Sequence, residues 1–231
     1  MATRRGRRRS VALATEDELW GARPPKQARS VDVIQRIAIA GQEMLATRDY
    51  DTVSIADIAS AAGVSVGAFY TRFPSKEHLV VHLMRDVAAD VLTELQRELS
   101  DQRLAGCGVA DVMRGYLSLM GRAFVRHRAL LRPASLIARQ TPHAELREFL
   151  RRFNDTAHGH VRSLLLARLD MLPSDVAITR IDTAVLWSSA AMREVLLYAE
   201  PVSSLSPRHA ALIAELTRGV AAYLTEPIPK T

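Results

Sequence analysis

The side chains whose types and spacing best suit a chemical task lie between Ser54 and Lys76. Ser54 and Asp57 have the spacing of a capping box that begins a helix, and Gly63 offers the left-handed conformation that ends one. Ser65 can cap a second short helix after the turn. Two short helices joined in this way can place hydrogen-bonding groups in the DNA major groove, against phosphates and base edges.

The second short helix carries small or polar side chains on the faces that we expect to lie outside. Phe69 and Phe73 are one turn apart and should face the core, while Gly67 and Ala68 allow close approach of the backbone to DNA. Thr71 and Arg72 are predicted to read bases or to bind the adjoining phosphates. The residues that we expect to contact DNA are Ser54, Ser65, Val66, Gly67, Ala68, Tyr70, Thr71, Arg72 and Lys76.

Other reactive residues form no recognisable catalytic pattern. The sequence has no glycine-rich phosphate loop, no HExxH and no nucleophile elbow, and Cys107 stands between glycines without a histidine nearby. His158 and His160 are two positions apart on an expected helix, so their rings point to different faces and cannot easily share a metal. We therefore expect no enzymatic activity, no metal and no cofactor.

The segment from Ser30 to about Val81 resembles the DNA-binding domain of the TetR family of bacterial transcriptional regulators. The resemblance rests on MLATRDYDTVSI followed by ADIASAAGVSVGAFYTRFPSKEHL, in which the family's pattern is met by Gly67, Phe69, Tyr70, Phe73 and Lys76. It implies that Tyr70 and Lys76 occupy the family's phosphate-contacting positions. Beyond Val81 the resemblance is architectural and implies no particular ligand.

Composition agrees with a globular protein. Of 231 residues, 48% are hydrophobic and 24% are charged, and the single cysteine cannot form an internal disulfide. No apolar stretch is long enough to cross a bilayer, and no hydrophobic region follows the first arginines. These features predict a cytoplasmic location.

Positive charge is concentrated at the amino terminus. Residues 1–29 hold eight basic and three acidic side chains, whereas residues 30–80 hold four basic and six acidic ones. A flexible basic arm could follow phosphates or the minor groove, or it could be a solvated tail. We expect three parts: the arm (1–29), a helix-turn-helix DNA-binding domain (30–76) and a helical effector-binding and dimerisation domain (77–231).

The hydrophobic periodicity predicts an all-α fold, with a three-helix DNA-binding domain and a larger helical domain. The expected long helices span about 30–48, 76–99, 109–126, 142–169, 173–198 and 207–224, with a short helix after Pro133.

The last two helices are predicted to form a homodimer. One face of the first holds Ile181, Ala184, Val185, Ser188, Ala191, Met192 and Val195, and one face of the second holds Leu212, Ile213, Leu216, Val220 and Tyr223. Small side chains permit close helix packing between subunits, although these faces could instead cover their own core. A two-fold dimer implies a palindromic operator.

Several large apolar residues and histidines in the middle of the body could line a pocket for a hydrophobic or aromatic effector, or could be ordinary core. They are Met113, Tyr116, Met120, Phe124, His127, Phe149, Phe153, His160 and Trp187. The sequence and the resemblance together predict a homodimeric repressor released from double-stranded DNA by a small molecule. The alternative is a DNA-binding protein that organises the chromosome or recruits a partner.

Overall fold

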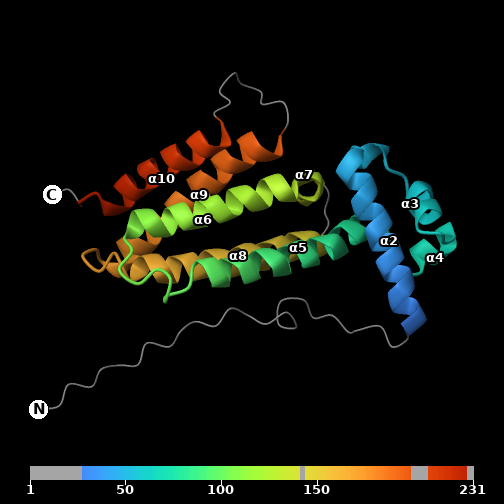
Figure 1. Cartoon of the computed structure of the whole chain (residues 1–231), viewed down its shortest axis with the longest axis horizontal. Coiled ribbons are helices and arrows are strands. Elements are labelled where there is room, and N and C mark those ends of the chain that lie inside the picture. Colours follow the sequence, from blue (N-terminus) through green and yellow to red (C-terminus); the bar gives the residue numbers. More distant parts are fainter. Residues whose placement is uncertain (1–27, 141–143, 199–207, 228–231) are drawn as a thin grey trace, which may run out of the picture.

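The computed structural model describes residues 28–140, 144–198 and 208–227, and these residues form helices and their connections (Figure 1). In chain order the elements are α2 (Ala28–Thr47), the 3-10 helix η1 (Tyr50–Thr52), α3 (Ile55–Ala61), α4 (Val66–Tyr70), α5 (Lys76–Glu98), α6 (Val109–Arg126), α7 (Arg128–Gln140), α8 (Ala144–Leu166), α9 (Ser174–Leu197) and α10 (His209–Thr225). The predicted all-α fold is confirmed. Residues 1–27, which carry most of the predicted basic arm, lie outside the described residues.

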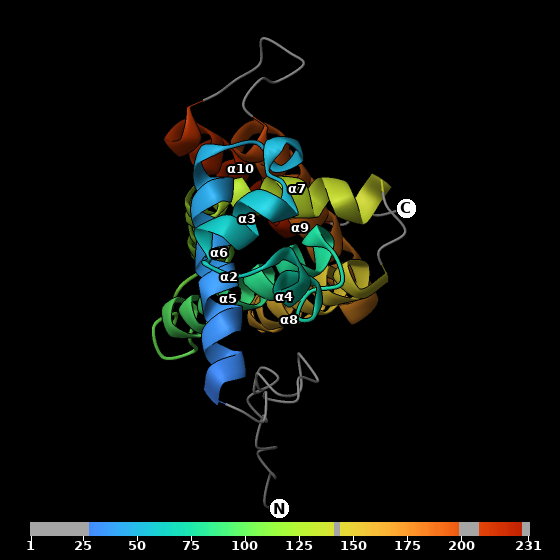
Figure 2. The same ribbon diagram turned by 90° about the vertical axis from the view of Figure 1, so that its right-hand side faces the viewer.

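A small domain at one end of the molecule is built from α2, α3 and α4, which Figure 2 shows from its outer side. The Ser54 hydroxyl accepts a hydrogen bond from the Asp57 amide at 3.1 Å, and the Asp57 carboxylate accepts one from the Ser54 amide at 3.2 Å. This is the predicted capping box. Gly63 ends α3 with a φ of 63°, in the left-handed region that the turn requires. Ile58 and Phe69 are buried beneath α3 and α4.

The long helix α5 leaves the small domain and runs along the body (Figure 1). It packs closely on α2, since a Cβ placed on Gly41 would lie 2.8 Å from Leu79 Cδ2. In the body, α5 packs on α6 and α8, and α10 packs across α6 and α9. One continuous apolar core joins these helices to the small domain.

The helix expected after Pro133 begins five residues earlier, and this prediction was wrong. Helix α6 ends at Arg126, and His127 follows it. The His127 carbonyl accepts hydrogen bonds from the amides of Leu130 and Leu131, so α7 is already formed before the proline. Pro133 lies inside α7. It removes one amide donor from the helix without ending it.

The faces of α9 and α10 that we predicted for the dimer lie largely inside the subunit, which also corrects the sequence interpretation. Ile181, Ser188 and Met192 of α9 are buried, and so are Leu212 and Val220 of α10. The reason is that α10 packs on α9 and α6 within one chain. The large apolar side chains that α9 leaves exposed are Ile178, Leu186 and Trp187.

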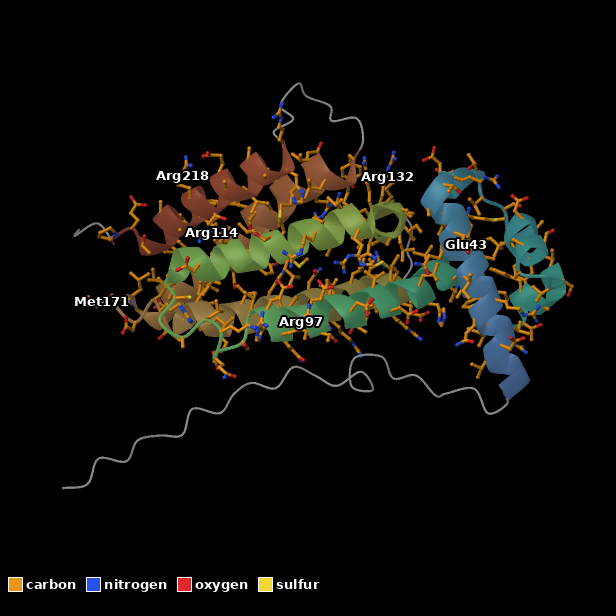
Figure 3. The ribbon with its side chains drawn as sticks, in the orientation of Figure 1. Glu43, Arg97, Arg114, Arg132, Met171 and Arg218 are labelled. Carbon is orange, nitrogen blue, oxygen red and sulfur yellow. The ribbon has the colours of Figure 1, made fainter. Side chains whose placement is uncertain are left out.

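The outer surface carries many charged side chains, among them Arg97, Arg114 and Arg218 (Figure 3). Among the helices that the structure describes, none is both long and apolar enough to cross a membrane.

Candidate DNA-binding surface and ligand cavity

Helix α4 is short, capped and exposed at the outer end of the small domain (Figure 2). The Ser65 hydroxyl accepts a hydrogen bond from the Ala68 amide at 3.1 Å, and the Thr71 hydroxyl donates to the Gly67 carbonyl at 2.8 Å. Both hydroxyl groups thus hold the helix together. They keep further hydrogen-bonding capacity for a ligand, because a hydroxyl has one donor and two acceptor sites.

The aromatic residues of α4 and of the turn after it show which face of α4 is buried and which is exposed. Phe69 is fully buried and packs on Phe73, with ring centroids 5.6 Å apart. Tyr70 is 51% exposed and meets the edge of Phe69. Because these rings anchor α4 to the core, its other faces point outward.

The other residues predicted to contact DNA lie on or beside α4. Ser54, Ser65, Val66, Gly67 and Thr71 are exposed, and Ala68 and Arg72 are partly buried. The structure therefore brings the predicted set together on one end of the molecule. Contact with DNA stays a prediction for each residue.

Lys76 has partners that the sequence did not indicate. Its ammonium donates hydrogen bonds to the carbonyls of Tyr50 at 2.7 Å and Val53 at 2.9 Å, and it lies 3.9 Å from the centre of the Tyr50 ring. Burial lowers the pKa of the Lys76 ammonium. An ammonium has three donors, so one remains for the predicted phosphate contact.

Tyr50 and Arg36 also form hydrogen bonds that stabilise the small domain. The Tyr50 hydroxyl donates to Glu77 Oε1 at 3.0 Å, and burial together with this carboxylate raises the Tyr50 pKa. Arg36 Nη1 donates to the Ala62 carbonyl at 3.0 Å, at the end of α3. Sequence reasoning missed both roles, because each partner lies 26 or 27 residues away in the chain.

A cavity of about 420 Å³ lies in the body and is bounded by α5, α6, α7, α8 and α9. Three residues predicted to bind a ligand line it, namely Met120, Phe124 and Phe153. Its other apolar lining includes Met84, Leu131, Ala134, Ala138, Leu150 and Leu197. A cavity of this size and lining suits a small organic molecule.

The other six residues predicted for ligand binding are not among those that line this cavity. Met113, Tyr116 and Phe149 are buried in the core, and Trp187 is exposed beside Tyr223. The His160 ring is 2.9 Å from the Leu99 carbonyl. At the end of α6, burial lowers the pKa of His127.

Tyr116 lies directly behind the cavity wall. Among the described residues, its buried hydroxyl has no hydrogen-bond partner in good geometry. Burial raises the Tyr116 pKa to about 12, and the smaller influence of the Ser189 hydroxyl lowers it. Ser189 lines the cavity. The Tyr116 ring also meets the edge of His158.

One side of the cavity is polar, which sequence reasoning missed. Arg162 forms an ion pair with Asp182, with 2.6 Å between Nη2 and Oδ1. Arg139 and Arg193 also line this side. The signal was present in α9, where Val185, Ser189, Arg193 and Leu197 follow at four-residue steps, so that an arginine interrupts an inward-facing stripe.

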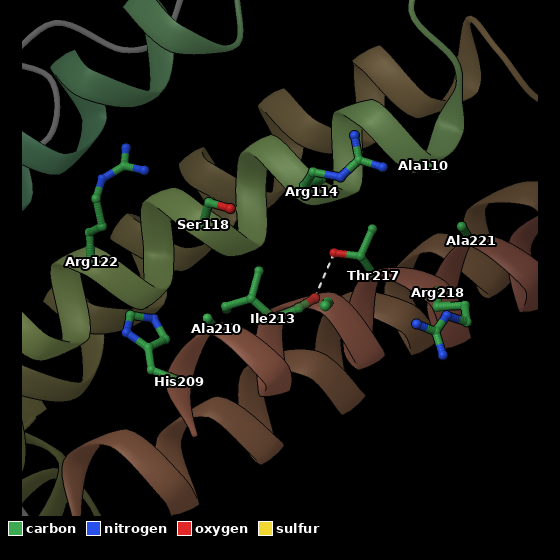
Figure 4. A pocket seen from close by; sticks show the side chains of 11 residues that line it. Ala110, Arg114, Ser118, Arg122, His209, Ala210, Ile213, Thr217, Arg218 and Ala221 are labelled. Carbon is green, nitrogen blue, oxygen red and sulfur yellow. Dashed lines mark hydrogen bonds between the residues drawn. The ribbon is translucent and has the colours of Figure 1, made fainter. Parts of the chain in front are cut away.

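A second hollow lies outside the core, between α6 and α10 (Figure 4). It measures about 720 Å³, and small side chains such as Ala210, Ala214 and Ser118 form much of its lining. Its three arginines are each paired with a carboxylate: Arg114 with Asp111, Arg122 with Glu98 and Arg218 with Glu215. This groove thus offers no unbalanced charge to a ligand.

His158 and His160 have separate surroundings, as their spacing predicted. His158 lines the cavity, while His160 meets the Leu99 carbonyl. In the part of the chain that the structure describes, no three histidine, cysteine, aspartate or glutamate side chains gather as metal ligands.

Comparison with known proteins connects the small domain to regulators. Residues 37–83 match the family described as bacterial regulatory proteins, tetR family. The HTH-type transcriptional regulator YwcC of Bacillus subtilis strain 168 is 38% identical over 65 residues. This match covers 26% of the chain and only 29% of YwcC, so it concerns one domain.

Solved structures share a fold with most of the chain. A TetR transcriptional regulator from Rhodococcus sp. RHA1 aligns with a TM-score of 0.52 and 18% identity, over 85% of this chain and 98% of that one. The TetR-family repressor FadR of Thermus thermophilus, solved with lauroyl-CoA, aligns with a TM-score of 0.57 and 20% identity, over 86% and 100%. At such identities the likeness establishes the fold.

Proposed function

We propose that this chain, whose amino-terminal domain belongs to the TetR family of bacterial regulatory proteins, is a DNA-binding transcriptional regulator. More narrowly, we propose a homodimeric repressor that binds a palindromic operator and is released by a small-molecule effector. The observation that carries the proposal is the capped, exposed helix α4, anchored to the core by Phe69. Such a helix can enter the major groove with its amino-terminal residues against base edges.

The exposed side of α9 supports the proposed dimer. Leu186 is 66% exposed and Trp187 is 53% exposed, and the Trp187 ring packs at a tilt against Tyr223 of α10 with 4.9 Å between the ring centroids. Large apolar side chains gathered on one outer face are typical of protein interaction sites. A two-fold axis near this face would pair α9 and α10 with their copies.

Helix α7 supports effector control, because it lies between the cavity and the small domain. Ala134 and Ala138 line the cavity, whereas Leu136 and Ile137 line a crevice shared with Leu45 of α2. Arg132 of α7 also lies 3.9 Å from the Asp49 carboxylate, beside η1. A ligand that moves α7 would therefore move the base of α2.

Release from DNA requires more than occupancy of the cavity. The effector must bind the DNA-free arrangement more tightly than the DNA-bound one, and such coupling is typically about 1–3 kcal/mol.

The test is to mix the purified full chain with genomic fragments of its source organism and to sequence the fragments that remain bound. One or a few palindromic sites near promoters would support a dedicated regulator. Many scattered sites would instead favour chromosome organisation, and no enrichment would contradict DNA recognition by α4.

A further inference from the structure

The cavity bounded by α5, α6, α7, α8 and α9 has an apolar side and a positively charged side. Phe124 and Phe153 contribute aromatic surface, and Met84 and Met120 add flexible apolar surface. Arg139 at the end of α7 and Arg193 on α9 belong to the same lining. The arrangement suits a molecule with an apolar body and a polar end.

The two arginines differ from Arg162, the third arginine of the lining. The charge of Arg162 is balanced by Asp182 at 2.6 Å. Within the described residues, neither Arg139 nor Arg193 has a carboxylate within ion-pair distance. Burial and the nearby Arg139 lower the pKa of Arg193, with Tyr198 acting in the opposite direction.

An anion would relieve this unfavourable pairing of two cations. A guanidinium binds a carboxylate through two parallel hydrogen bonds, and such bonds are strong where solvent is partly excluded. We infer that the cavity takes a small organic carboxylate, whose apolar body lies beside Phe124 and Phe153 and whose carboxylate meets Arg139 and Arg193. This inference rests on the proposed function, which requires an effector in the body.

The neutral groups on the polar side limit the charge of the ligand. Burial lowers the pKa of His158, which favours its neutral form, and the adjacent Asn154 and Ser189 are uncharged. The positive charge open to a ligand thus comes from the two arginines without carboxylate partners. One carboxylate can meet both of them, so we expect a ligand with one anionic group. The volume of about 420 Å³ lies near the lower end of the range for small-molecule sites.

The experiment measures binding of matched acids and amides to the full chain by isothermal titration calorimetry. The probes are octanoate, decanoate, 4-phenylbutyrate and 2-naphthoate, each compared with its uncharged primary amide. We expect at least one acid to bind tenfold or more tightly than its amide. Equal affinity of every acid and its amide, or no binding by any acid, would overturn the inference.

Variants assign the preference to the two arginines. Arg193→Gln and Arg139→Gln are each expected to weaken acid binding about tenfold, and Arg193→Lys is expected to lose less. Since Arg139 is exposed, its substitution also tests the site without disturbing the core. Arg218→Gln is the matched control, because Arg218 lies on the outer surface and pairs with Glu215. An acid preference that persists in both glutamine variants would place the anion elsewhere.

DNA binding by the unsubstituted chain separates this inference from the proposed function. If acids bind through the arginines but leave DNA affinity unchanged, the carboxylate inference is supported and the proposed release from DNA is contradicted. If acids bind but the chain enriches no DNA, only the proposed DNA recognition is contradicted. If DNA binds and is released by a neutral compound in preference to acids, the regulator stands and the carboxylate inference fails.

Discussion

At the scale of single residues, the same side chain can serve the fold and the DNA surface. Lys76 stands at the position that resembles a phosphate contact, yet its ammonium already joins the start of α5 to the carbonyls of Tyr50 and Val53. The Val53 residue is buried, so water cannot easily replace the lost donor there. Substitution should therefore affect stability as well as DNA affinity.

Lys76→Ala is expected to lower the free energy of unfolding by about 1–3 kcal/mol, because it leaves two carbonyls without this donor. It should also weaken binding to all DNA sequences and flatten the salt dependence, if the third donor meets a phosphate. Chemical denaturation and DNA titration at several salt concentrations measure the two effects. Lys76→Arg, which keeps a donor, is the control. Unchanged stability of the alanine variant would contradict the structural role.

Tyr116→Phe tests the buried hydroxyl behind the cavity. An unpartnered buried polar group is unfavourable, so its removal should raise the free energy of unfolding by about 1 kcal/mol. Thermal unfolding of the two proteins measures the difference, with Tyr70→Phe on the exposed face as the control. A clear loss of stability would instead show that Ser189 forms a hydrogen bond with Tyr116.

At the scale of secondary-structure elements, α4 combines weak helix formers with strong local caps. Gly67 lies in the first turn of the helix, between the Ser65 cap and the Thr71 side-chain hydrogen bond. A Cβ at Gly67 would meet no atom closer than 3.9 Å within the chain. The glycine is therefore not required for packing inside this subunit.

Gly67→Ala should have opposite effects on stability and on DNA binding. Alanine favours helix, so we expect a gain of about 0.5 kcal/mol in unfolding free energy. The added methyl lies on the proposed DNA face, so operator affinity should fall about tenfold, or about 1.4 kcal/mol. Denaturation and DNA titration provide the two measurements.

Gly159→Ala in α8 is the matched control for this substitution. A Cβ there would meet no atom within 4 Å, so the variant should gain stability without losing DNA affinity. If Gly67→Ala bound DNA as tightly as the original chain, α4 would not approach DNA at this residue.

At the scale of the whole molecule, the position of α7 connects the cavity to the base of α2, and the outer face of α9 is available for a second subunit. Leu186 belongs to both features, because it lines the cavity and is 66% exposed, whereas Trp187 is absent from the cavity lining and contacts Tyr223. A substitution at Trp187 therefore tests dimerisation without changing a residue of the cavity lining.

Trp187→Glu is expected to convert the proposed dimer to a monomer, because it places a charge in the proposed apolar interface. Analytical ultracentrifugation at several concentrations measures the mass. Met171→Glu is the control, since Met171 is 92% exposed in the connection before α9. A monomeric original chain, or a variant that still dimerises as tightly, would contradict an interface at Trp187.

The sequence by itself determined the features that depend on neighbours within about four residues. The Ser54 and Asp57 capping box, the Gly63 turn and the Ser65 cap all have the predicted hydrogen bonds or backbone angle. The helices from Ala28, Lys76 and Val109 were also predicted to within about two residues at each end. Caps and periodicity are local interactions, so their signal is contained in short segments.

Only the tertiary structure decided which apolar faces lie inside one subunit and which residues surround the cavity. The inward face of α9 is covered by α10 of the same chain, and periodicity cannot distinguish that partner from a second subunit. Lys76 and Arg36 likewise find carbonyl partners more than twenty residues away. Met120 and Phe124 line the cavity while Met113 and Tyr116 of the same helix fill the core, because long-range packing places the neighbouring helices differently along α6.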